Sequence, residues 1–326
     1  MASKIGSNLD NDVDFKLLTF TAEQIQGFEA AAKEIEPFFF LPVTEENFNS
    51  VLNIWHGLIS ALPLPLVSTD VNFILRSRPN DENEIFEDEA DVSYNSKRPD
   101  LIGPGRFNRP FEAVFYGTLP SDQQDKFIAA TSTESYKELI SDRNTKEVLY
   151  YHFCKFRVKT PFPVLNLCFE PRVLSLHPGL NRLVMGHIKN LKENLPPDSF
   201  KAILRFWHYL SKLASERKLC NQHYMITTAL FCAIRHYYET RSDDRVNGLI
   251  YPSPMVYGDA VNIVMMPHAV DTFLEADDCF MFKYIRGLHN PKHFDTDICS
   301  KPSKVSGGKL NISAVVWGRD PGNYGY

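Results

Sequence analysis

The sequence predicts an α+β protein in which short strands occur in several groups and the long helices gather between residues 181 and 241. Three observations lead to this fold class. Residues 147–159 alternate and are rich in tyrosine, phenylalanine and valine, as in a strand. Residues 198–218 carry apolar side chains at helical spacing. Hydrophobic residues make up 44% and charged residues 23%, as in an ordinary globular protein, and 326 residues are enough for one large elaborated domain or for a core with a second, smaller lobe.

Residues 1–68 are predicted to form an N-terminal helical extension. A polar stretch, 1–20, reads as a loosely held leader. Helices are expected at 21–35, which begins with an N-cap residue, and at 44–59, which ends before Leu62-Pro63-Leu64-Pro65. The aromatic face of the second helix is interpreted as core rather than as a binding groove.

Residues 69–290 are predicted to form the main domain. Its strands are expected at 71–78, 113–116, 147–159, 163–169, 260–266 and 278–286. Its helices are expected at 125–143, 181–191, 198–218 and 224–240, with Asn247-Gly248 as the stop of the last one. The acidic stretch 80–100 is expected to be a solvated loop. In the last section, 291–326, a loop that continues to Gly308 precedes a final strand at 310–317 and a loose tail.

Composition limits the classes of function. The formal charge of −5 argues against a general binder of nucleic acid or of acidic membranes. No run of about eighteen apolar residues suggests a membrane span, and the N-terminus lacks the pattern of a signal peptide, so we expect a cytoplasmic protein. None of the six cysteines forms a C-x-x-C pair, which predicts reduced thiols and no metal site. We assign no ligand role to any of the ten histidines.

One stretch, residues 105–117, combines a turn rich in glycine and proline with a short apolar strand. It places Arg106 at a loop edge, and arginine suits a phosphate because its planar fork donates two parallel hydrogen bonds. Tyr116 follows with a flat ring that could stack on a nucleotide ring. The simpler interpretation is a surface arginine beside an ordinary hairpin.

Two further features follow in order: Glu134 on a predicted helix, and the segment Gly248-Leu249-Ile250-Tyr251-Pro252-Ser253. Together with Gly105-Arg106-Phe107-Asn108 and Tyr116, they resemble the RES-domain family, named for its arginine, glutamate and serine. The resemblance covers about residues 70–290. Glu134 follows Tyr116 by 18 residues, a longer interval than in compact family members. Glu138 therefore remains a rival, and both glutamates also suit an exposed helix face.

The resemblance implies a fold similar to ADP-ribosyltransferases, with a split, twisted β-sheet core that holds NAD+ and helices around it. It also implies an NAD+ glycohydrolase or phosphorylase, in many members the toxin of a toxin–antitoxin pair that is neutralised by a protein antitoxin. Two alternatives stay open. One is an ADP-ribosyltransferase acting on a protein target, and the other is a non-catalytic, RES-like protein that binds a nucleotide or a partner.

The residue types suit this chemistry. Cleavage of the nicotinamide–ribose bond creates an oxocarbenium-like ribose, which a nearby carboxylate such as Glu134 stabilises. Arg106 would hold the pyrophosphate, with Arg76 or Arg78 as second grips.

Tyr116 would stack on or orient the nicotinamide end, and Ser253 would hydrogen-bond the ribose or the amide. Asn108 and Tyr251, from the same motifs, complete the predicted binding set. The sequence does not reveal whether water, inorganic phosphate or a protein accepts the ADP-ribosyl group.

Overall fold

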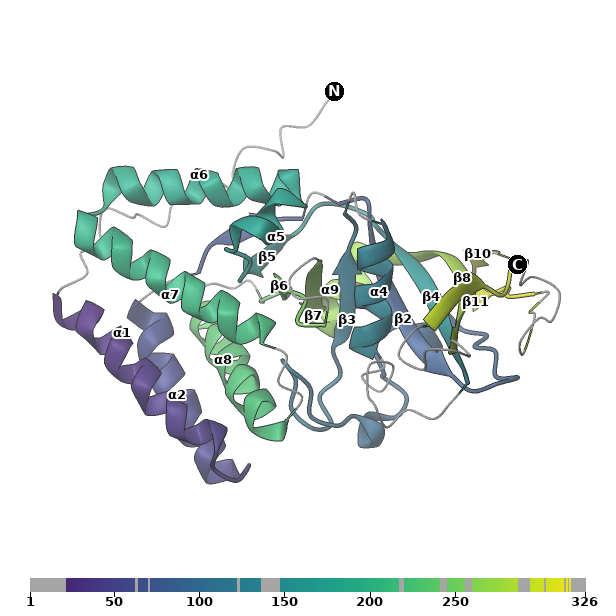
Figure 1. The fold of residues 1–326 in the computed structure, drawn as a ribbon, viewed down its shortest axis with the longest axis horizontal. Helices are drawn as coiled ribbons and strands as arrows, with labels where there is room; N and C mark the ends of the chain where they lie inside the picture. Colours follow the sequence, from purple (N-terminus) through teal and green to yellow (C-terminus); the bar gives the residue numbers. More distant parts are fainter. Residues whose placement is uncertain are drawn as a thin grey trace.

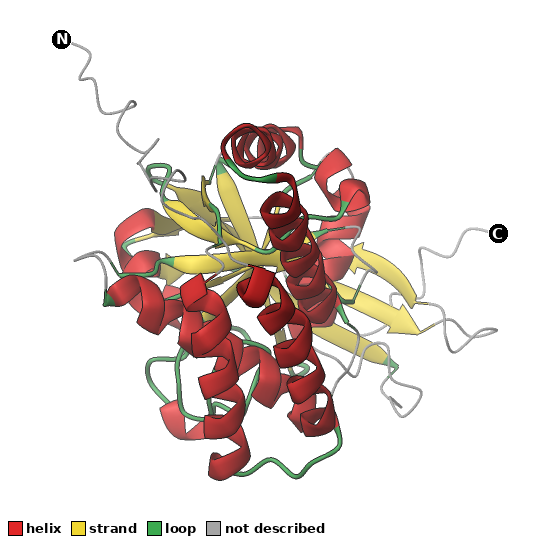
Figure 2. Cartoon of the chain, turned by 90° about the vertical axis from the view of Figure 1, so that its left-hand side faces the viewer, coloured by secondary structure: helices red, strands yellow, loops and turns green. Residues whose placement is uncertain are grey.

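The computed structural model describes residues 22–61, 64–69, 71–121, 124–135, 147–216, 220–240, 245–255, 260–286, 294–301, 303–313, 315 and 317. These residues form a mixed α/β structure with one large twisted sheet and helices packed against it (Figures 1 and 2). The mixed fold class predicted from the sequence is confirmed at this level.

The strands are β1 (Leu66–Ser68), β2 (Phe73–Asn80), β3 (Phe115–Leu119), β4 (Val148–Val158), β5 (Pro163–Asn166), β6 (Gly248–Pro252), β7 (Val261–Met265), β8 (Leu274–Arg286), β9 (Phe294–Ile298), β10 (Ser303–Ser306) and β11 (Lys309–Leu310). The helices are α1 (Ala22–Ile35), η2 (Glu36–Phe39), α2 (Glu45–Ala61), α3 (Glu89–Val92), η3 (Pro99–Leu101), α4 (Gln124–Ser135), α5 (Pro171–Ser175), α6 (Pro178–Asn194), α7 (Pro197–Ser215), α8 (Asn221–Glu239) and α9 (Pro267–Phe273).

Neighbouring strands in the sheet follow the order β1-β5-β6-β7-β3-β2-β4-β8-β10-β11, and β9 pairs with β8. The pair β5–β6 is parallel, and the other pairs are antiparallel. The longest ladder of the sheet joins β2, β4 and β8, and the last two of these strands are rich in aromatic residues. The sheet therefore joins segments from nearly the whole described chain.

The strands β2 and β3 diverge almost as soon as they meet. Their register consists of the pair Leu75↔Thr118. Beyond it, the Arg76 guanidinium bridges the gap, because Nη1 donates to the Tyr116 carbonyl at 2.6 Å and Nε donates to the Val92 carbonyl at 2.8 Å. A side chain thus replaces the ladder hydrogen bonds at the place where the sheet opens.

The helix α4 lies across β2 and β3 (Figure 1). Side chains alternate across a strand, and residues paired across neighbouring strands share a face. Ser77, whose hydroxyl donates to the Thr131 carbonyl of α4 at 3.0 Å, marks the covered face. Arg76 and Arg78 alternate with Ser77 and so point to the opposite face of the sheet.

The helices α1, α2, α7 and α8 pack beside the sheet (Figures 1 and 2). α2 packs along α8, and the buried Trp55 donates its indole N–H to the Ile226 carbonyl at 3.1 Å. Ile35, Val51 and Trp55 belong to the same buried cluster as Phe115 of β3. The N-terminal helices therefore share one apolar core with the sheet.

Most predicted elements appear close to their expected positions, including α1, α2, β4, α6 and α7. Several expectations were wrong. The short β1 lies inside the section predicted to be a helical extension, and the expected acidic loop contains α3 and η3. The predictions for residues 1–20, for Glu138 and for 318–326 lie outside the described residues.

Gly248 does not stop a helix. The helix α8 ends at Glu239, and Gly248 begins β6. A Cβ atom at Gly248 would lie 2.3 Å from the Val264 carbonyl oxygen. The glycine is therefore needed because β7 approaches this backbone too closely for a side chain.

The C-terminal section was also predicted wrongly. The expected loop contains β9 and β10, and the expected strand at 310–317 reduces to β11, while its described residues after Leu310 form no strand. Gly307 and Gly308 have φ of 57° and 73°, which suits the two-residue turn that joins β10 to β11. The glycine pair therefore marks a hairpin.

The expectation of reduced thiols fails for two cysteines. Cys154 of β4 and Cys279 of β8 are directly opposite in the ladder, with Cα atoms 4.3 Å apart, and form a disulfide. Cys168 and Cys299 are buried, and neither takes part in a disulfide. The spacing of cysteines along the chain could not reveal a pair that the register of two distant strands creates.

Candidate functional site

The turn that carries Arg106 is held by Asn108 and Tyr116. The Asn108 amide donates to the carbonyls of Gly103 at 3.0 Å and Arg109 at 2.9 Å. The Tyr116 hydroxyl accepts from the Phe107 N–H at 2.8 Å and donates to Asn108 Oδ1 at 3.0 Å. Both residues, predicted to contact a ligand, thus fix the backbone that presents Arg106.

The helix α8 holds the same turn from its other side. Thr228 Oγ1 donates to the Gly105 carbonyl at 3.1 Å, and Thr227 Oγ1 donates to the Arg106 carbonyl. The Phe107 ring packs edge-on against Tyr251, with ring centroids 4.8 Å apart. The turn is therefore held between α8 and β6. The simpler interpretation from the sequence, a surface arginine beside an ordinary hairpin, did not foresee this packing.

Arg106 is buried, with 5% of the residue exposed. Its Nη1 lies 2.9 Å from Nε2 of the buried His223, and its guanidinium carbon lies 5.8 Å from the centre of the Tyr224 ring. A guanidinium has five N–H donors and no acceptor, so His223 Nε2 is the acceptor of this hydrogen bond.

Glu134, near the end of α4, meets Ser253 and Asn262. The Ser253 hydroxyl donates to Glu134 Oε1 at 3.0 Å, and Asn262 Nδ2 donates to the same oxygen at 2.8 Å. Asn262 Oδ1 in turn accepts from Thr118 Oγ1 at 3.2 Å. We call these four residues the Glu134 cluster.

Strand register explains why these side chains meet. Thr118, Asn262 and Tyr251 are successive cross-strand partners on β3, β7 and β6, so they share one face of the sheet. Ser253 extends β6 by one more hydrogen bond, from its N–H to the Ala260 carbonyl, and alternation puts its side chain on the same face as Tyr251. The helix α4 covers this face and brings Glu134 to it.

Electrostatics link Arg106 to the Glu134 cluster. Burial raises the pKa of Tyr116, Tyr224 and Tyr251, in the case of Tyr224 to about 12. The charge of Arg106 lowers, and that of Glu134 raises, the pKa of each of these three phenols. The charges of Arg106 and Glu134 thus act on the same three phenols, with opposite sign.

Arg76 and Arg78 do not join this group, because they lie on the opposite face of the sheet. Arg76 bridges β2 and β3 as described above, and burial, followed by the charge of Arg78, lowers its pKa to about 9. Arg78 donates to the Asp91 carbonyl and lies over the Phe86 ring. Both arginines are thus engaged with this chain's own backbone and aromatic rings.

Sequence reasoning missed Asn262, His223 and Thr227. Asn262 lies in an apolar strand, where one amide among valines and methionines is the sole signal of a polar function. His223 and Thr227 are one helical turn apart on α8 and both reach the Arg106 turn. No motif marks them, since their role depends on where α8 packs.

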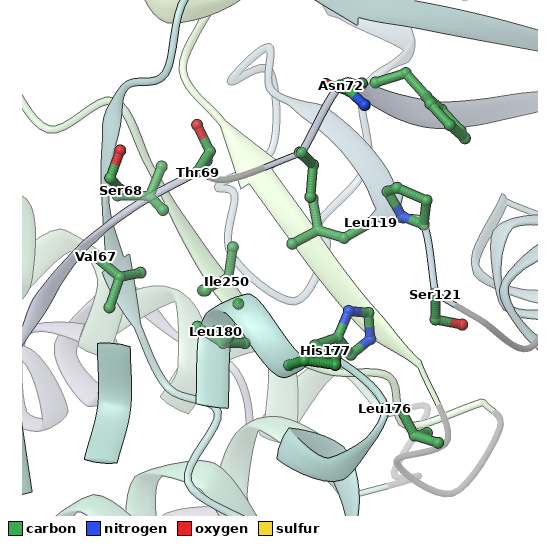
Figure 3. A pocket seen from close by; sticks show the side chains of 16 residues that line it. Val67, Ser68, Thr69, Asn72, Leu119, Ser121, Leu176, His177, Leu180 and Ile250 are labelled. Carbon is green, nitrogen blue, oxygen red and sulfur yellow. The ribbon is translucent and has the colours of Figure 1, made fainter. Parts of the chain in front are cut away.

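The structure also contains a pocket of about 360 Å³ (Figure 3), and strand alternation indicates that it lies on the other face of the sheet. Leu119 and Ile250 line it, and they alternate along their strands with Thr118 and Tyr251. His177, at the start of α6, also lines this pocket (Figure 3). The pocket is therefore separate from the Glu134 cluster.

Among the residues that the structure describes, no three histidine, cysteine or acidic side chains are grouped as metal ligands would be. Within the same part of the chain, no helix combines the length and apolar character needed to cross a membrane. Comparison of the chain with models of known protein families gave no match, and a search of curated proteins found no significant relative.

Proposed function

We propose that this protein is an NAD+-consuming enzyme that cleaves the nicotinamide–ribose bond by hydrolysis or phosphorolysis. The observation that carries the proposal is the hydrogen bond from Ser253 to Glu134. The Arg106 turn lies beside this pair, because the ring of Phe107 packs against Tyr251, two residues before Ser253. Arginine, glutamate and serine are the three residue types for which the RES-domain family is named, and here they come from distant parts of the chain.

Glu134 is the proposed catalytic carboxylate. Departure of neutral nicotinamide leaves positive charge on the ribose, and a fixed carboxylate stabilises that charge without reorganisation. Ser253 and Asn262 hold Glu134 Oε1 in place with two hydrogen bonds. Ser253 therefore acts by orienting Glu134, in addition to any bond to the ribose or the amide of nicotinamide, and it is not a nucleophile.

Arg106 is the proposed grip for the pyrophosphate. The hydrogen bond to His223 uses Nη1, one of the three nitrogens of the guanidinium. The turn is held by Thr227, Thr228 and Tyr116, and this fixes the direction in which the Arg106 guanidinium points. We assign Arg76 and Arg78 no contact with the substrate, because they lie on the opposite face.

The proposed fold is the split, twisted sheet of the RES-domain and ADP-ribosyltransferase type. The divergence of β2 from β3 beside Tyr116 supports it. We further propose a cytoplasmic toxin whose activity a protein antitoxin restrains. Expression of the chain by itself should then arrest growth, and Glu134→Gln should relieve the arrest.

The acceptor is identified from the products. The full chain is incubated with NAD+ labelled in the adenosine part, with and without inorganic phosphate, and with a host-cell protein extract. ADP-ribose indicates hydrolysis, an ADP-ribosyl phosphate indicates phosphorolysis, and label on protein indicates an ADP-ribosyltransferase. Intact NAD+ in every arm contradicts the enzymatic proposal.

Burial favours a second candidate, a nucleotide-binding protein without turnover. Ser253 is fully buried, and Arg106 nearly so. A polar site that is shielded from solvent in this way suits a nucleotide sensor. It also suits an enzyme whose site opens to admit substrate. Binding of NAD+ in the same assay, with no loss of NAD+ over many hours, would establish the sensor.

A further inference from the structure

We propose that the N-terminal helical segment, residues 22–61, is part of the substrate site, because it positions Arg106 through His223. This inference rests on the proposed function, and it gives that segment a role beyond completing the core. In this account His223 is a positioning residue: it touches Arg106 and not the substrate.

The first link joins α8 to Arg106. Nη1 of Arg106 can only donate, so His223 must offer a lone pair on Nε2, 2.9 Å away. A ring that accepts at Nε2 carries its hydrogen on Nδ1, and that nitrogen lies 3.9 Å from Glu216 Oε2. The imidazole is thus a directional acceptor that fixes one arm of the guanidinium.

The second link joins the N-terminal helical segment to His223. The Phe39 ring, at the end of η2, stacks on the imidazole with centroids 5.8 Å apart and an interplanar angle of 27°. The indole of Trp55 anchors α2 to the backbone of α8 one turn further along that helix. A ring stacked on one side of His223 limits its rotation, and so limits the positions that Arg106 can occupy.

A third contact reaches the other end of the same turn. The Arg109 guanidinium lies over the ring of Phe48, a residue of α2, at 4.4 Å from its centre. The N-terminal helical segment therefore acts on the turn 105–109 at two points. It contacts Arg109 directly, and it reaches Arg106 through His223. Small displacements of a binding group cost large factors in rate, so these contacts should matter for function.

Neighbouring residues supply a matched pair of variants. Phe39 stacks on His223, whereas Phe40 is 88% exposed. We would compare Phe39→Ala with Phe40→Ala, and His223→Leu with His223→Gln, all in the full chain. Glutamine restores an acceptor near the position of Nε2, and leucine does not.

Two readouts separate this inference from the proposed function. The first is the Kd for NAD+ together with kcat. We expect Phe39→Ala and His223→Leu to raise Kd about 10- to 100-fold. Phe40→Ala and His223→Gln should stay within about threefold of the wild type, and kcat should change less than Kd in every variant.

The second readout needs no ligand. Amide hydrogen exchange of the peptide that spans residues 105–109 should be faster in Phe39→Ala than in Phe40→Ala, with exchange in the sheet unchanged. Equal exchange, or equal Kd, in these two variants overturns the inference. Failure of the wild type to bind NAD+ while exchange responds as expected overturns the proposed function and leaves the positioning of Arg106 in place.

Discussion

Ser253 donates a hydrogen bond to Glu134 at 3.0 Å, although 119 residues separate them in the chain. The contact exists because β6 puts Ser253 on the face of the sheet that α4 covers. Asn262 donates to the same carboxylate oxygen at 2.8 Å. Such paired donors fix a carboxylate in one orientation, as a preorganised electrostatic site requires.

Replacement of Gly105 tests the packing of the Arg106 turn. A Cβ atom at this position would lie 2.2 Å from Asn108 Oδ1 and 3.1 Å from the Tyr116 hydroxyl. Gly105→Ala should therefore destabilise the protein by about 1–3 kcal/mol, measured by urea unfolding. Gly103→Ala, in the same loop, is the control because its Cβ would meet nothing within 4 Å. Equal stability of the two variants would show that the turn can relax.

Loss of the Tyr116 hydroxyl distinguishes two roles for this residue. Tyr116→Phe leaves the Phe107 N–H without its acceptor, which should cost about 1–3 kcal/mol and weaken NAD+ binding by loosening Arg106. If Tyr116 acts by stacking its ring on the substrate, as the sequence indicated, the phenylalanine variant should keep both stability and Kd. Urea unfolding and calorimetric titration with NAD+ decide between these outcomes.

Arg76 offers a test of the two faces of the sheet. Arg76→Met removes hydrogen bonds to the carbonyls of Tyr116 and Val92, and we expect a loss of about 3 kcal/mol in the free energy of unfolding. The Kd for NAD+ should stay within about threefold. Arg205→Met, on the exposed surface of α7, controls for loss of charge. A large rise in Kd without loss of stability would restore Arg76 as a second grip on the pyrophosphate.

The buried side chain of His152 should make the stability of the protein depend on pH. Its Nδ1 lies 3.1 Å from Asn80 Oδ1, its Nε2 accepts from the Phe86 N–H, and burial lowers its pKa from 6.5 to about 4. The unfolded chain therefore binds a proton more readily. The contribution of His152 to the free energy of unfolding is fully present above pH 6.5 and is lost as the pH falls toward 4.

The expected loss between pH 7 and pH 5 is about 2 kcal/mol. The free energy of unfolding should be measured at both pH values for the wild type and for His152→Gln, which cannot titrate. A loss of the same size in both proteins would rule out His152 as the source.

Particular residues show how much of the candidate site could be predicted from the sequence. Arg106 and Ser253 were singled out because each stands in a short motif, and Glu134, with Glu138 as a rival, because of its place on a helix between them. The structure brings Glu134 and Ser253 into contact. Arg76 and Arg78 were grouped with them on residue type, but strand alternation, once the register is known, sends them to the other face.

Other features depend on packing that no local pattern encodes. His223 reaches Arg106 because α8 lies against the turn, and Cys154 pairs with Cys279 because two strands 125 residues apart share a register. Gly248 was read as a helix stop, yet close approach of β7 requires it. Long-range contacts, rather than propensity, decided each of these cases.

Turnover of NAD+ by the wild type and by Glu134→Gln is the most direct test of the proposed role of Glu134. Glutamine retains an oxygen that can accept from Ser253 and Asn262, so the fold should persist while the negative charge is lost. Glu193→Gln, on the exposed surface of α6, is the control. We expect nicotinamide release by the wild type and the control, and a decrease of about 10²- to 10³-fold in kcat for Glu134→Gln. Equal rates of release by the wild type and Glu134→Gln would contradict the account.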